Sequence, residues 1–161
     1  GEYSISIYRE TRPNGASRYR ITMRAAEESL WQASSGGVDP TKAETVKIRQ
    51  IDVSITPELA RVLRDALAAM VDQTRPLGHE EQPAKIVIEG PLTEVMVLRD
   101  GKVVAGQMGN FPPTMPKLRL LEKLIANLKS LCESPPSDRT HLLAEVTSSA
   151  EALRNEIASG R

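Results

Sequence analysis

Apolar and polar residues alternate near the start of the chain in a pattern typical of a β-hairpin. The segments YSISI and RYRITMR each place an apolar set on one face of a strand. A loop of Pro13, Asn14 and Gly15 has the length that brings these sets opposite each other, with Gly15 in the left-handed position of a bulge. The predicted register pairs Ile7 with Ile21 and Ile5 with Met23.

The next stretch of alternation, TVKIRQIDVSI, changes phase near Gln50, which predicts a bulge within one long strand. The hairpin and this strand together take up residues 3–55. A helix is predicted over residues 56–74, because Thr56 suits the N-cap position and Pro57 suits the first helical position. An apolar stripe at helical spacing follows.

A meander of three strands is predicted over residues 85–108. Asp100–Gly101 favours a two-residue type I′ turn between its last two strands. Both faces of that hairpin are then apolar, so the second face needs cover from the C-terminal helix or from a second copy of the chain. The predicted register pairs Val97 with Val104 and Leu98 with Val103.

Two further helices are predicted, over residues 115–132 and 140–158. The segment before the first of them, GNFPPTMP, is interpreted as a connector in preference to a recognition loop. The last helix carries a narrow apolar seam that suits one partner helix or groove. The candidate interface residues of this seam are Leu142, Val146, Ala150, Leu153 and Ile157.

These elements predict an α+β fold in a single domain over residues 1–161. We expect a mainly antiparallel sheet of about six or seven strands, with two amphipathic helices packed on it and a third, C-terminal helix. A composition of 40% hydrophobic and 26% charged residues agrees with a globular domain, and 3% aromatic residues predict an aliphatic core.

The charge balance disfavours a nucleic-acid partner, because 21 basic residues meet 21 acidic ones and no basic excess remains. One local feature differs from this average. Arg18, Arg20 and Arg24 alternate along one strand face close to Tyr8, and such a candidate basic face would suit a phosphate backbone or an acidic partner. We favour the simpler interpretation, the solvated side of an antiparallel sheet.

Side chains suited to catalysis or metal binding are scarce. The single Cys132 lies on the apolar face of a predicted helix, and neither His79 nor His141 has metal-ligand spacing. The sequence contains no nucleophile elbow, phosphate-binding loop or dinucleotide fingerprint. We therefore predict no catalytic, cofactor-binding or metal-binding residues and no cofactor.

By exclusion, the sequence predicts a non-catalytic binding or scaffolding protein of bacterial type that acts through a protein–protein interface. Its partner is expected to be another protein or a second copy of the chain, in a homodimer. The alternative is a small-ligand-binding or enzymatic domain with a cleft between sheet and helices, so the enzyme question stays open. The third interpretation is nucleic-acid contact through the arginine-rich sheet face.

The compartment stays open as well. No apolar run approaches the ~18 residues that a membrane span needs, so a soluble protein is expected. Gly1 is typical of the residue that remains after a tag is removed. The sequence therefore agrees both with a cytoplasmic protein and with an exported protein whose signal has been removed.

Overall fold

A computed structural model describes residues 3–27, 47–72, 75–76, 93–108 and 116–159. They fall into two compact units. The first unit lies within Gly1–Ala60 and Asn127–Leu143, and the second within Arg61–Ala126 and Ala144–Arg161. The predictions for His79, the first meander strand and most of the GNFPPTMP connector lie outside the described residues.

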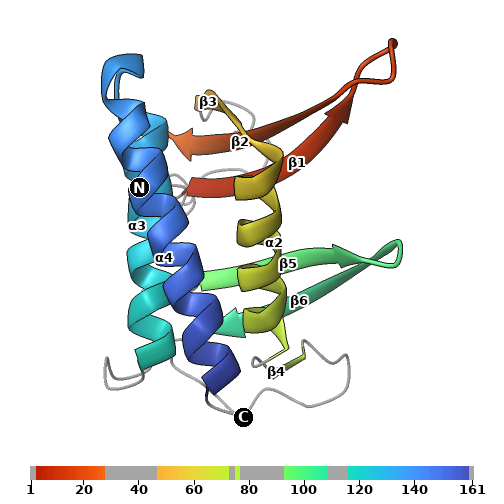
Figure 1. The fold of residues 1–161 in the computed structure, drawn as a ribbon, viewed down its shortest axis with the longest axis vertical. Helices are drawn as coiled ribbons and strands as arrows, with labels where there is room; N and C mark the ends of the chain where they lie inside the picture. The colour runs from red at the N-terminus through yellow and green to blue at the C-terminus, as the bar shows by residue number, and fades with distance from the viewer. Residues whose placement is uncertain (1–2, 28–46, 73–74, 77–92, 109–115, 160–161) are drawn as a thin grey trace, which may run out of the picture. The chain divides into compact units, whose positions relative to one another are not determined.

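The first unit contains a three-stranded antiparallel sheet in the order β1-β2-β3 (Figure 1). Ile7 lies opposite Ile21 and Ile5 opposite Met23, so the predicted hairpin register is confirmed. The Gly15 amide donates to the Arg12 carbonyl at 2.9 Å, and Gly15 has a φ of 79°, as the predicted turn and bulge require. The strands are β1 (Tyr3–Thr11), β2 (Ser17–Ala26) and β3 (Ile48–Ile55).

Strand β3 pairs with β2 without interruption, so the predicted bulge near Gln50 is wrong. The pairs run from Ala26 opposite Ile48 to Tyr19 opposite Ile55 in one continuous register. The change of phase in the sequence has a simpler cause: Ile48 points to the same side as Gln50 and is 65% exposed. An apolar residue on the solvent side of a strand imitates a slip of register.

The opposite side of this sheet belongs to the core of the first unit. Ile21, Met23 and Val53 are buried there. The end of α3 (Pro116–Glu133) lies against this sheet, since Arg49 on β3 forms an ion pair with Glu133 at 3.4 Å. On the other face of the sheet, Ile48 and Gln50 are exposed, whereas Thr22 is buried.

The second unit contains the hairpin of β5 (Thr93–Arg99) and β6 (Lys102–Met108), with the two-residue β4 (Arg75–Pro76) beside β6. Asp100 and Gly101 both have positive φ, 51° and 75°, which is the geometry of the predicted type I′ turn. The predicted register is confirmed: Val97 lies opposite Val104 and Leu98 opposite Val103.

The three predicted helices are present, with ends close to the predicted ones. Thr56 caps α2 (Pro57–Val71), since its hydroxyl accepts a hydrogen bond from the Leu59 amide at 3.2 Å. A short 3-10 turn, η2 (Pro136–Asp138), separates α3 from α4 (Arg139–Ser159).

The described residues therefore form an α+β structure with three helices and antiparallel sheets. The prediction of one sheet with six or seven strands is wrong for this part of the chain. It contains five strands of seven to ten residues and the two-residue β4, divided between two sheets. Alternation along a strand reveals its two faces but not which distant strand lies beside it. The single domain stays a prediction.

Candidate functional site

The predicted interface on α4 is buried inside the chain. Val146, Ala150 and Leu153 are fully buried, Ile157 is almost fully buried, and Leu142 is half-buried. The sequence left two roles for this seam, packing within the chain and contact with a partner chain. The observed burial favours packing within the chain.

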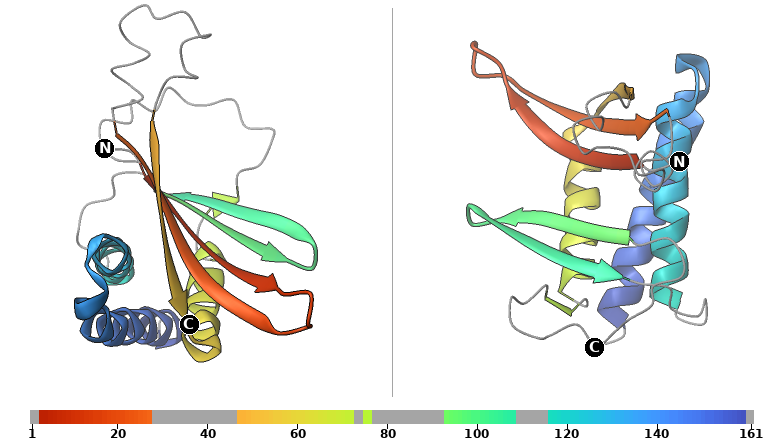
Figure 2. Two further views of the ribbon diagram at one scale, coloured as in Figure 1. Left: turned by 90° about the horizontal axis from the view of Figure 1, so that it is seen from above. Right: turned by 180° about the vertical axis from the view of Figure 1, so that it is seen from behind.

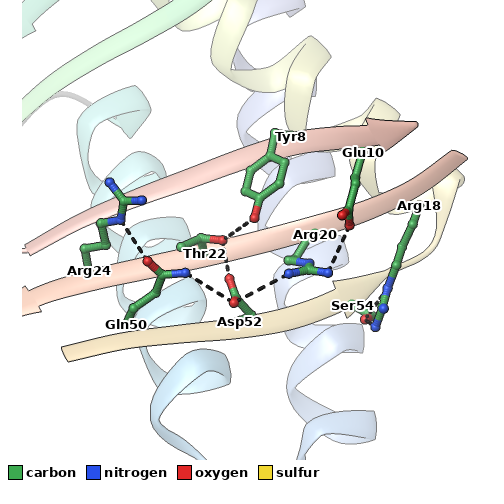
Figure 3. Close-up of polar contacts among 9 residues, drawn as sticks. All are labelled: Tyr8, Glu10, Arg18, Arg20, Thr22, Arg24, Gln50, Asp52 and Ser54. Carbon is green, nitrogen blue, oxygen red and sulfur yellow. Dashed lines mark hydrogen bonds and ion pairs between the residues drawn. The ribbon is translucent and has the colours of Figure 1, made fainter. Parts of the chain in front are cut away.

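The three predicted arginines do share one side of the sheet, where Arg18 and Arg24 are exposed and Arg20 is half-buried. Cross-strand pairing places alternate residues of β1, β2 and β3 on the same side of the sheet, away from the core of the first unit (Figure 3). We call this side the polar face. Its interacting members are Tyr8, Glu10, Arg18, Arg20, Thr22, Arg24, Gln50, Asp52 and Ser54.

Arg20 lies at the centre of the polar face and is the best-paired of the three arginines. Its guanidinium forms ion pairs with Glu10 at 3.0 Å and with Asp52 at 3.6 Å. Among the buried side-chain polar atoms of the described residues, the Arg20 Nε atom has no hydrogen-bond partner. The two ion pairs are the contacts that orient the Arg20 guanidinium.

Arg18 and Arg24 have only uncharged partners in the described structure. Arg18 donates to the Ser54 hydroxyl through Nε and Nη2, and Arg24 donates from Nε to the Gln50 amide oxygen at 3.1 Å. Their charges are therefore not neutralised by direct ion pairs. With Glu10 and Asp52 as the carboxylates among the members named above, this group has a net charge of +1.

A chain of hydrogen bonds connects Tyr8, Thr22 and Asp52 across the three strands. The Thr22 hydroxyl lies within hydrogen-bond distance of the Tyr8 hydroxyl, at 3.0 Å, and of an Asp52 carboxylate oxygen. An ionised carboxylate only accepts, so Thr22 donates to Asp52 and Tyr8 donates to Thr22. This bond from Thr22 is the largest cause that holds the pKa of Asp52 below its ordinary value of 3.8, with further help from Gln50 and Arg20.

We expect Thr22→Val to raise the pKa of Asp52 toward 3.8, because the near-isosteric valine removes this donor. A lowered pKa means that the native state binds the Asp52 proton less readily than the unfolded state does. The resulting stabilisation is present above the unfolded pKa and is lost as the pH falls through the folded pKa. As the pH drops below about 4, the free energy of unfolding should therefore fall less for Thr22→Val than for the wild type.

Carboxyl carbon chemical shifts across an NMR pH titration give the Asp52 pKa directly. Ser54→Ala is the matched control, since Ser54 bonds to Arg18 and not to Asp52. An Asp52 pKa that is the same in the wild type and in Thr22→Val would contradict the assignment of Thr22 as its main partner.

A second exposed surface lies on the β5–β6 hairpin in the second unit. Met96, Leu98 and Val103 are 61%, 71% and 66% exposed. Leu98 pairs with Val103 and Met96 pairs with Ala105, so all four lie on one side of the hairpin. We call this side the hairpin face. Leu98 and Val103 were predicted from the sequence, whereas Met96 was not, although the same alternation along β5 places it on this side.

An arginine fixes the turn end of this hairpin. Arg99 donates two hydrogen bonds to the Asp72 carboxylate, at 2.9 and 3.1 Å, and so ties β5 to the end of α2 within the second unit. The hydrogen bonds that Arg99 donates to Asp72, and the negative charge of that carboxylate, raise the pKa of Arg99 above the ordinary value. The pair is exposed, so its main effect is to orient β5 rather than to stabilise the fold.

The described side chains that most often serve in catalysis or metal binding, Cys132 and His141, are placed as follows. Cys132 is buried, and burial raises its pKa to about 11, so the thiol stays protonated and unreactive at neutral pH. His141 lies at the edge of an open hollow of about 680 Å³ lined by Ser134, Ser137, Asp138, Thr140, His141 and Leu142. The described residues contain no group of three or more His, Cys, Asp or Glu side chains arranged to hold a metal ion.

The buried thiol leads to a pH-dependent prediction. Ionisation of Cys132 is disfavoured in the folded state, so its contribution to stability is present below the unfolded pKa and is lost as the pH rises toward about 11. We expect the urea midpoint of the wild type to fall between pH 9 and pH 11 more steeply than that of Cys132→Ala. Equal slopes for the two proteins would contradict the raised pKa.

Comparison with protein-family models, with curated proteins and with solved structures finds no match for this chain. Of the helices that the structure describes, none combines the length and the apolar character needed to cross a membrane.

Proposed function

We propose that the protein is a non-catalytic binding protein that self-associates through the hairpin face. The observation that supports this most directly is the exposure of Met96, Leu98 and Val103, each more than half exposed, on one side of two paired strands. Full burial of a side chain of this size contributes about 1.5–3 kcal/mol, so three adjacent ones favour association.

A second copy of the chain fits this surface for two reasons. The exposed large side chains of the hairpin face are aliphatic and carry no charge, so the face is complementary to itself, as a two-fold interface requires. The adjoining turn carries Asp100 and Lys102, one charge of each sign, so a two-fold contact brings together no excess of like charge. A small apolar contact of this kind gives a weak, reversible dimer.

Sedimentation velocity over protein concentrations from about 10 µM to about 1 mM tests this proposal, because weak association appears only toward the upper end. We expect the weight-average mass to rise with concentration for the wild type and to stay at the monomer value for Leu98→Glu with Val103→Glu. Ser148→Glu with Asn155→Glu adds the same charge at exposed positions of α4 and should behave like the wild type. A wild type that stays monomeric throughout this range would refute the proposal.

The ligand-binding or enzymatic alternative stays a prediction. The open hollow near His141 is lined by exposed and half-buried side chains, and no described group of residues favours that alternative over an interface.

A further inference from the structure

Positive charge gathers at the turn end of the β1–β2 hairpin. Residues 8–20, which we call the basic hairpin, contain four arginines, one glutamate and no lysine or aspartate, a net charge of +3. Arg9, Arg12 and Arg18 are exposed, and Arg20 is half-buried. The neutral total of the whole chain conceals this concentration, because the compensating acidic residues lie elsewhere in the sequence.

Aromatic rings accompany these arginines. Tyr8 lies opposite Arg20 on the polar face, and Arg9 lies opposite Tyr19 on the other side of the hairpin. The Cβ atoms of directly opposed side chains are about 4.5–5.5 Å apart, so each tyrosine starts close to an arginine. The three tyrosines of the chain, at positions 3, 8 and 19, all lie on β1 and β2.

The basic hairpin is both accessible and ordered. Pairing with β3 ends at Tyr19, so the hairpin beyond that residue extends past the end of β3 (Figure 2). Tyr8 is 40% exposed, and its hydroxyl bonds to Thr22, which is itself held by Asp52. The Tyr8 ring is therefore fixed in direction while part of its surface faces solvent.

We propose that the basic hairpin binds single-stranded nucleic acid, with the arginines on backbone phosphates and Tyr8 stacked on a base. Guanidinium groups donate paired hydrogen bonds to phosphate oxygens, and the bases of a single strand offer faces that stack on aromatic rings. An acidic protein segment offers carboxylates to the arginines but no bases to stack on the tyrosine ring. The combination of the two residue types therefore favours the nucleic acid.

Glu10 limits this binding in the free protein. Its carboxylate takes up one side of the Arg20 guanidinium at 3.0 Å and is about half exposed. Exposed ion pairs of this kind are weak, so a phosphate can replace the carboxylate. Glu10→Gln removes the competing anion and raises the net charge of the hairpin, so it should tighten binding.

Fluorescence anisotropy with a labelled single-stranded oligouridylate at low salt tests the proposal. We expect Arg12→Gln with Arg18→Gln to weaken binding about tenfold or more, and Glu10→Gln to strengthen it severalfold. Arg61→Gln with Arg154→Gln, at exposed positions of α2 and α4, removes the same charge and should change the affinity less than about twofold.

The tyrosine separates stacking from charge alone. Tyr8→Leu should weaken binding about tenfold, while Tyr8→Phe keeps the ring and should restore most of the affinity even though it cannot bond to Thr22. Far-UV circular dichroism confirms that each variant is folded. Absence of binding at low salt would overturn the proposal. So would binding that Tyr8→Leu leaves unchanged and that oligoglutamate displaces as well as unlabelled RNA does, which would indicate an acidic protein partner.

Discussion

Leu153→Ala should lower the free energy of unfolding by about 2–5 kcal/mol, the usual cost of removing a fully buried leucine side chain. Leu153 is 0% exposed in the middle of the α4 seam. The loss combines the missing apolar burial with the cavity that remains, and both terms are large where neighbouring side chains cannot relax into the space. Urea unfolding followed by far-UV circular dichroism measures it.

Leu98→Ala is the matched control for this experiment, since the same substitution is made at a side chain that is 71% exposed. At protein concentrations low enough to keep the chain monomeric, its effect should stay within about 0.5 kcal/mol. The comparison also decides the role of α4. If the seam met a partner chain instead of its own core, Leu153→Ala would be nearly neutral in the monomer.

The local structure was predictable because its signals are local. Loop length and glycine position fix the register of the first hairpin, and Asp100–Gly101 fixes that of the second, since each turn type permits one pairing. The cap at Thr56 follows in the same way from the preference of a threonine hydroxyl for the free amides at a helix start. These features depend on residues within a few positions of each other.

The arrangement of the sheets was not predictable for the opposite reason. Both hairpins have an apolar side, and nothing in their alternation says whether they share one sheet or form two. The bulge predicted near Gln50 was wrong for a related reason, because Ile48, an apolar residue on a solvated face, looks like a change of register. Packing against the rest of the chain decides both questions.

The polar face was predictable only in part. Alternation along β2 showed that Arg18, Arg20 and Arg24 share a side. The partners that distinguish them come from β1 and β3, and Asp52 lies 30 residues from the Thr22 hydroxyl that holds its charge. No spacing rule connects residues so far apart in sequence, so the difference between the well-paired Arg20 and its two neighbours emerges only from the fold.

Ile21→Ala should have an effect comparable to that of Leu153→Ala, about 2–5 kcal/mol, because Ile21 is 0% exposed on the central strand of the first sheet. Ile48→Ala is its matched control on the neighbouring strand. The uninterrupted pairing of β3 places Ile48 on the polar face, so its truncation should change stability by no more than about 0.5 kcal/mol. A large loss for Ile48→Ala would contradict this register.

The same pair of core substitutions tests whether the chain is one domain. Ile21 belongs to the first unit and Leu153 to the second. If the chain unfolds as one cooperative domain, as the sequence predicts, each substitution shifts a single transition that both units share. Amide hydrogen exchange reports the two units separately in the same sample. Faster exchange confined to the first unit in Ile21→Ala, and to the second in Leu153→Ala, would instead show two domains that unfold independently.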